Sequence, residues 1–153
     1  MRWLELRVPP PVVGGAVALL MWLAAGALPT LDFPLPSRRL LAAVLVALGL
    51  CSGLVAYFQF RAARTTVHPM KPQESSALVI RGIYRLTRNP MYLGMLLILG
   101  AWAAWLANAA ALLLLPAFVA YLTRFQIAPE ERALEVRFGA AFVAYRRAVR
   151  RWL

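Results

Sequence analysis

A group of polar residues stands where a long apolar run begins, in TRNPMYLGMLL at residues 87–97. Proline is favoured at the first position of a helix, because an N–H there would have no partner, so Pro90 predicts a helix start. The backbone amides of Met91–Leu93 would then be free. Together with the positive end of the helix dipole they suit an anion or a carboxylate, and Arg88 adds a positive charge beside them.

Two neighbouring glutamates, Glu130 and Glu131, form a second polar group behind Pro129. In the first turn of a helix they would complement the helix dipole, which is a structural role. In a binding site they would accept charge-assisted hydrogen bonds from an ammonium or from hydroxyl groups. The residues alone leave both interpretations open.

The chain contains few residues that could bind a metal through sulfur or imidazole or form a disulfide: one cysteine, Cys51, and one histidine, His68. No Cys/His metal cluster and no disulfide framework can be assembled within one chain, so we expect no metal. His68 is the one side chain whose ordinary pKa lies near neutrality, and it would suit a base if the substrate were an amine.

The composition indicates what must position these groups. Apolar side chains make up 62% of the 153 residues and the mean hydropathy is +0.67, values typical of an integral membrane protein. The formal charge is +11, and the arginines flank apolar segments. Topology and anionic lipid headgroups explain such a charge better than nucleic acid, for which no recognisable module is present.

Four apolar segments are predicted to cross the membrane: residues 11–28, 40–58, 91–106 and 109–127. The last two form one unbroken stretch, 91–127, which would be about 55 Å long as a single helix and so far exceeds the bilayer core. We therefore expect a tight helical hairpin with Asn108 at its tip. The fold class is an all-α integral membrane protein, and residues 1–153 form a single domain.

The distribution of charge orients this bundle. Four spans put the N-terminus, the loop 59–90 and the C-terminal tail on one side, which holds 15 of the 17 basic residues; Arg38 and Arg39 lie on the other. Positive residues favour the cytoplasmic side, so both termini are expected there, in a bacterial-type inner membrane. The tail, 129–153, has apolar residues at intervals of three and four and is expected to be an amphipathic helix at the membrane surface.

Two motifs resemble the isoprenylcysteine carboxyl methyltransferase and phospholipid methyltransferase superfamily of membrane enzymes. The first is LVxxGxYxxxRxPxYxG, which runs from Leu78 to Gly94, and the second is EExxLxxxFGxxFxxYxxxVxRW, from Glu130 to Trp152. The asparagine at position 89, where the eukaryotic prenylcysteine enzymes usually have histidine, resembles the short bacterial members. With the four spans, the resemblance covers roughly residues 40–153.

The resemblance implies S-adenosylmethionine as the cofactor. The chain has no GxGxxG and no room for a doubly wound sheet, so the pocket would be built from the two motifs. The residues expected to bind the cofactor are Gly82, Tyr84, Arg88, Asn89, Pro90, Met91, Tyr92, Gly94, Glu130 and Glu131. Arg88, Tyr92 and Arg147 are expected to act in the reaction, with Arg147 or a neighbouring tail arginine holding the charge of the acceptor.

The expected partners are membrane lipids and a lipophilic or membrane-associated acceptor, for which a carboxylate, a thiol and a lipid amine are the alternatives. A non-enzymatic membrane scaffold or assembly protein is the alternative, since it would keep the spans and the basic tail without needing the two ordered motifs. Ion or proton transport is disfavoured, because residues 11–28, 40–58 and 91–123 contain no charged side chain. The oligomeric state stays open.

Overall fold

The computed structural model describes residues 5–63 and 77–153, and its regular elements within those ranges are all helical, as the sequence predicts. They are α1 (Pro10–Ala27), the short 3-10 helix η2 (Pro29–Leu31), α2 (Arg38–Ala62), the 3-10 helix η4 (Gly82–Arg85), α3 (Pro90–Leu106), α4 (Ala109–Leu122), the π-helix η5 (Thr123–Ile127), α5 (Ala128–Phe138) and α6 (Ala140–Ala148). Three helices are long and apolar enough to cross a membrane: Pro10–Ala27, Arg38–Ala62 and the continuous helix Ala109–Phe138. The apolar helix α3 is shorter, at 17 residues.

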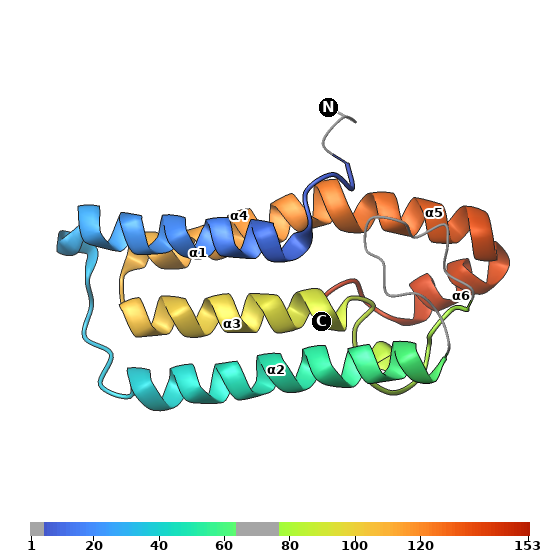
Figure 1. Cartoon of the computed structure of the whole chain (residues 1–153), viewed down its shortest axis with the longest axis horizontal. Coiled ribbons are helices and arrows are strands. Elements are labelled where there is room, and N and C mark those ends of the chain that lie inside the picture. Colours follow the sequence, from blue (N-terminus) through green and yellow to red (C-terminus); the bar gives the residue numbers. More distant parts are fainter. Residues whose placement is uncertain (1–4, 64–76) are drawn as a thin grey trace.

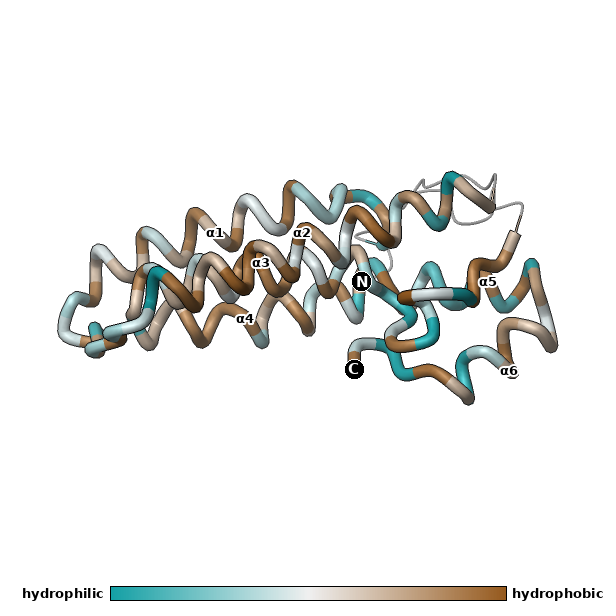
Figure 2. The backbone as a smooth tube through the Cα atoms, turned by 90° about the horizontal axis from the view of Figure 1, so that it is seen from below, coloured by the Kyte–Doolittle hydropathy of each residue, from teal (hydrophilic) through white to brown (hydrophobic). Residues whose placement is uncertain are grey.

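The four long helices lie side by side, with α3 between α2 and the pair formed by α1 and α4 (Figure 1). The α1–α2 connection and the α3–α4 turn share one end of the bundle. The end of α2, the start of α3, and α5 and α6 share the other end. Figure 2 shows hydrophilic segments gathered around α5 and α6, beyond the mostly hydrophobic bundle, and a smaller hydrophilic group at the opposite end.

The helices α2 and α3 approach closely at two glycines. A Cβ added to Gly94 would lie 2.6 Å from the carbonyl oxygen of Gly49, and one added to Gly49 would lie 2.7 Å from that of Gly94. Near the start of α3, the Ser52 hydroxyl also donates to the Pro90 carbonyl at 2.7 Å inside the contact. The contact between α2 and α3 thus fixes where α3 begins.

The predicted hairpin between α3 and α4 is confirmed, and Asn108 lies at its tip. Ala107 ends α3 in the left-handed conformation, with φ of 49°. The Asn108 side-chain oxygen Oδ1 then caps α4 by accepting from the backbone amides of Ala110 and Ala111, at 2.9 and 3.3 Å. Its amide nitrogen donates to the Asp32 carboxylate at 2.7 Å, which ties the hairpin to the α1–α2 connection.

The outward faces of α1 and α2 are apolar and exposed, as expected of helices that contact lipid. Leu40, Leu48 and Phe58 on α2 are each more than half exposed, and Cys51 on the same helix is exposed. These exposed apolar side chains would be unfavourable in water. Contact with the hydrocarbon of a bilayer removes their apolar surface from water.

The tail differs from the single helix expected over 129–153. The helix of α4 does not end before Pro129, but continues through η5, where the Ala128 amide donates to the Thr123 carbonyl, and into α5. A proline early in α5 is tolerated because the wider π turn rearranges the local hydrogen bonds. Gly139, with φ of 53°, then reverses the chain into α6, and no helix continues beyond Ala148.

Candidate active site

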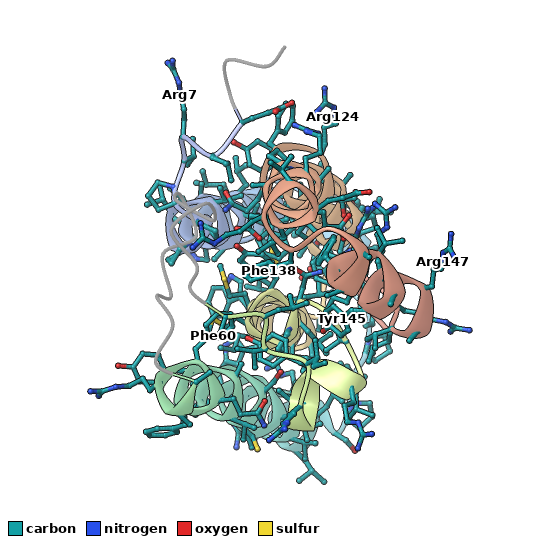
Figure 3. The ribbon with its side chains drawn as sticks, turned by 90° about the vertical axis from the view of Figure 1, so that its right-hand side faces the viewer. Arg7, Phe60, Arg124, Phe138, Tyr145 and Arg147 are labelled. Carbon is teal, nitrogen blue, oxygen red and sulfur yellow. The ribbon has the colours of Figure 1, made fainter. Side chains whose placement is uncertain are left out.

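The polar residues of both motifs meet at the end of the bundle where α3 begins. Figure 1 shows the start of α3, η4, α5 and α6 grouped at this end. Figure 3 views the same end, with Tyr145 lying between α6 and α3, whereas Arg124 and Arg147 point outward. Segments far apart in the sequence therefore supply one polar cluster.

The start of α3 is held by the segment that follows α6. The Arg88 amide donates to the Arg150 carbonyl at 3.0 Å. The Asn89 side-chain amide and the Thr87 hydroxyl both donate to the Arg151 carbonyl, at 2.8 and 3.2 Å. The backbone of 87–89 and that of 150–151 thus lie against each other, which brings the second motif to the first.

Glu131 is buried and is paired with two arginines. Arg151 makes a two-point contact with it: Nε donates to Oε1 at 3.0 Å and Nη2 donates to Oε2 at 2.6 Å. Arg88 makes one contact, from Nη2 to Oε1 at 3.0 Å. The hydrogen bonds to Glu131 raise the pKa of Arg151. Two guanidinium groups and one carboxylate leave one net positive charge, with the Arg88 and Glu131 side chains mostly buried and the Arg151 side chain 35% exposed.

Arg88 keeps two donors without an acceptor. Its side chain is only 9% exposed, and within the described part of the chain no group accepts from its Nε or Nη1. Burial lowers the pKa of Arg88, while Glu131 acts in the opposite direction. A buried donor without an acceptor costs free energy, so the Nε and Nη1 groups, which we call the open donors, are suited to an anion.

Glu130 has a separate environment formed by α3 and η5. The Tyr92 hydroxyl donates to its Oε1 at 2.6 Å, and the Gln126 side-chain amide donates to the same atom. Gln126 is 2% exposed and lies in the π-helix. Such π turns occur frequently at functional sites, because they redirect side chains on the following turn. Here the following turn carries both glutamates.

Tyr84 is buried beside this cluster. Its carbonyl accepts from the Tyr145 hydroxyl at 2.7 Å, and its ring meets that of Phe60 edge-on at 5.4 Å. Burial raises the pKa of the Tyr84 hydroxyl well above its ordinary value, with smaller contributions from Tyr145 and Glu130. Burial also raises the pKa of Tyr145 to about 12, against the effect of Arg88. Both phenols are therefore neutral at ordinary pH.

The first turn of α3 retains part of the anion-binding character that the sequence predicts. Met91 and Tyr92 stand in that turn, where helix geometry supplies no backbone acceptor for their amides, and the Asn89 side chain does not cap them. The amide of Leu93, which we expected to be free, donates to the Asn89 carbonyl at 2.9 Å. Pro90 is buried at the helix start, as predicted.

The other predicted site residues lie in different surroundings. Gly82 adopts φ of 59°, and the Gln59 side chain packs so closely on it that a Cβ would overlap the amide. Gly94 is in the α2–α3 contact rather than in the polar cluster. Arg147 is exposed on α6 and points away from the cluster (Figure 3). His68 lies outside the described residues.

The helix-dipole interpretation of the two glutamates is wrong. Because α4, η5 and α5 form one continuous helix, Glu130 and Glu131 are not at a free helix end. Their carboxylates instead accept hydrogen bonds from side chains of α3, η5 and the segment after α6. This arrangement favours the interpretation of the glutamates as parts of a site.

Three residues of the cluster were not predicted as site residues: Thr87, Gln126 and Arg151. The sequence does single out Gln126, because it is an amide side chain near the end of an apolar run that has few polar side chains. Arg151 belongs to the second motif, but a helical period over 129–153 places it on a solvent face. Its role depends on the chain leaving the helix after Ala148.

Comparison with known proteins agrees with this geometry. The model of a family described as phospholipid methyltransferase matches residues 37–141, which is more than half of the chain. The chain belongs to the phospholipid methyltransferase family. That family is part of the superfamily indicated by the two motifs, so the resemblance is confirmed. The matched range holds Arg88, Tyr92, Glu130 and Glu131, whereas Arg151 lies beyond it.

Membership in the phospholipid methyltransferase family supports methyltransferase activity on lipid-like substrates. With the apolar helices, it indicates an integral membrane protein. An uncharacterized protein of Haemophilus influenzae is 49% identical to this chain over 63 residues, which are 41% of this chain and the whole of that protein. No solved structure matches the chain.

Proposed function

We propose that this protein transfers a methyl group from S-adenosylmethionine to a lipophilic or membrane-associated acceptor at the cytoplasmic face of the membrane. The observation that carries the proposal is the buried Arg88 guanidinium with its open donors, next to the first turn of α3. Family membership supports the reaction class. The cofactor and the acceptor are our inference.

The residues present fit the amino acid end of this cofactor. Its carboxylate needs donors in a place of positive charge, and Arg88 offers Nε and Nη1 within the group of Arg88, Glu131 and Arg151, which has one net positive charge. The amides of Met91 and Tyr92 would add to the binding of an anion there. A carboxylate and a guanidinium form hydrogen bonds about twice as strong as neutral ones.

The remaining contacts follow from the chemistry of the cofactor. Its ammonium and ribose hydroxyls are donors, and of the two glutamates Glu130 is the one that no guanidinium contacts within residues 5–63 and 77–153. The Tyr84 and Tyr92 rings would flank the adenine or face the sulfonium, which aromatic rings attract. We assign Glu131 to orienting Arg88, and Gly82 to the backbone turn that places Tyr84.

The protein's part in the reaction is mainly positional. S-Adenosylmethionine, when bound, supplies an electrophilic methyl group, so the chain's residues bind and orient the reactants and exclude water. A carboxylate or thiolate acceptor needs no strong base. An acceptor from the bilayer reaches the site laterally, and exposed tail arginines such as Arg147 are placed to attract an anionic headgroup rather than to touch the reacting atoms.

We infer the orientation from the charge distribution. Arg38 and Arg39 begin α2 at the end opposite the cluster, while Arg61, Arg88, Arg124 and the arginines of α5 and α6 are at the cluster end (Figure 1). By the positive-inside tendency the cluster end faces the cytoplasm, where the cofactor is made. Residues 1–153 then act as one domain, because the site combines α3 with the last residues of the chain.

Ligand-dependent stabilisation of the purified protein tests the proposal. S-Adenosylmethionine or S-adenosylhomocysteine at about 100 times its dissociation constant is expected to stabilise the fold by roughly 2.7 kcal/mol. Arg88→Ala should remove most of this effect, while Arg39→Ala, an equal truncation at the opposite end, should retain it. Absence of any melting shift in folded wild-type protein at millimolar ligand would instead support the scaffold alternative.

A further inference from the structure

We propose that Arg151 is a positioning residue for the cofactor: by holding Glu131 in a two-point contact, it prevents Glu131 from using the open donors of Arg88. This inference rests on the proposed function and names a residue beyond the matched family range. Arg151 itself is not placed against the cofactor. Its effect passes through Glu131 to Arg88.

The contacts of Glu131 give the first argument. Arg151 uses both carboxylate oxygens, whereas Arg88 uses only Nη2 on Oε1. Carboxylates and guanidinium groups tend to form two parallel hydrogen bonds when nothing competes. Without the Arg151 side chain, Glu131 would gain such a pair with Arg88 and occupy a second donor. The donors needed for a bound carboxylate would then be satisfied inside the protein.

Charge gives the second argument. Arg88, Arg151 and Glu131 together carry one positive charge, which complements one carboxylate. Glu131 and the Arg88 side chain are both nearly inaccessible, at 8% and 9% exposed, so solvent screens the charges of these two groups less than that of Arg151, whose side chain is 35% exposed. Removing the Arg151 guanidinium leaves a pair of Arg88 and Glu131 without net charge, which weakens the attraction for an anion.

The backbone around Arg151 explains why its side chain is available for this role. Its carbonyl accepts from Thr87 and Asn89, and the Trp152 indole donates to Thr123 at 3.2 Å. These contacts fix the segment through groups other than the Arg151 guanidinium. A change of that side chain therefore leaves the attachment of the segment to α3 and η5 in place.

Calorimetry with two ligands tests this role: S-adenosylhomocysteine and its decarboxylated analogue, which differ only in the carboxylate. Wild-type protein should bind the first roughly ten- to a hundredfold more tightly. Arg151→Met should lose most of that preference by weakening the first ligand, with the analogue unchanged. Arg132→Met, which removes an exposed arginine of α5 paired with Glu5, should keep the preference.

A second variant separates positioning from damage to the fold. In Arg151→Met/Glu131→Gln the competing charge is gone, so part of the preference for the carboxylate should return. If Arg151→Met does not fold, Arg151→Lys keeps a charge without the two-point geometry and should show a partial loss of preference. An unchanged preference in the folded single variants, or equal weakening of both ligands, overturns the role of Arg151. Failure of wild-type protein to bind either ligand overturns the proposed function, and this assignment with it.

Discussion

Tyr92 of α3 and Glu130 of α5 are joined by a hydrogen bond of 2.6 Å, donated by the phenol to the carboxylate across 38 positions of sequence. This contact links the two motifs directly. Gln126 donates to the same oxygen, so this partly buried carboxylate has two donors from two helical elements. The position of Glu130 therefore depends on how α3 packs against η5 and α5.

The first prediction concerns that phenol. Tyr92→Phe removes one donor from the partly buried Glu130 carboxylate while keeping the ring, so the variant is expected to lose about 1–3 kcal/mol of stability. Thermal melting of the purified protein without ligand measures this cost. Tyr57→Phe, at an exposed position of α2, is the matched control and should leave the melting temperature unchanged. Equal melting of the two variants would show that the hydrogen bond contributes nothing.

The second prediction concerns the α2–α3 contact. Gly94→Ala places a Cβ only 2.6 Å from the Gly49 carbonyl oxygen, so the helices must separate at an expected cost of about 1–3 kcal/mol. Gly53→Ala is the control on α2, because nothing lies within 4 Å of its added Cβ. Melting curves of both variants compare them. A stable Gly94→Ala protein that loses only cofactor affinity would instead support a direct role of Gly94 in the pocket.

The third prediction concerns alkaline pH. The folded protein raises the pKa of Tyr145 from its ordinary value of 10.0 to about 12, so folding favours the protonated phenol. The stability from this group is present below pH 10 and is lost as the pH rises from about 10 to about 12. Melting temperatures measured across that interval should fall less steeply for Tyr145→Phe than for wild-type protein. Parallel curves for the two proteins would contradict the shift.

The fourth prediction concerns topology. In a protein whose native cysteine is replaced by Cys51→Ala, Ser37→Cys lies in the α1–α2 connection and Val136→Cys lies on α5, 89% exposed in wild type. A membrane-impermeant thiol reagent applied to intact cells should label the first and not the second. Both should react after the membrane is opened. Labelling of Val136→Cys in intact cells would reverse the proposed orientation.

The helical bundle followed from local features of the sequence. The length of the stretch 91–127 required a turn, and Asn108 is a residue that caps helices, so the hairpin could be placed. Pro90 likewise marked the start of α3. These features act over a few residues, and the structure confirms them.

The course of the tail could not be predicted in the same way. Pro129 normally indicates a helix start, but the π turn before it lets the helix continue, and no local pattern distinguishes these outcomes. The spacing of apolar residues over 129–153 also predicts a continuous helix and gives no indication that α6 ends at Ala148. Because the position of Arg151 depends on that end and on contacts with Thr87 and Asn89, its place in the cluster is a tertiary effect.

Transfer of labelled methyl from S-adenosylmethionine into solvent-extractable lipid tests the central claim most directly. Membranes containing wild-type protein or Arg39→Ala should incorporate label above membranes without the protein. Arg88→Ala should lower that rate by about tenfold or more, because the open donors disappear. The fold should persist, because Arg151 still pairs with Glu131. Incorporation by Arg88→Ala equal to that of wild type would contradict the account, as would wild-type membranes that transfer no label to any extractable acceptor.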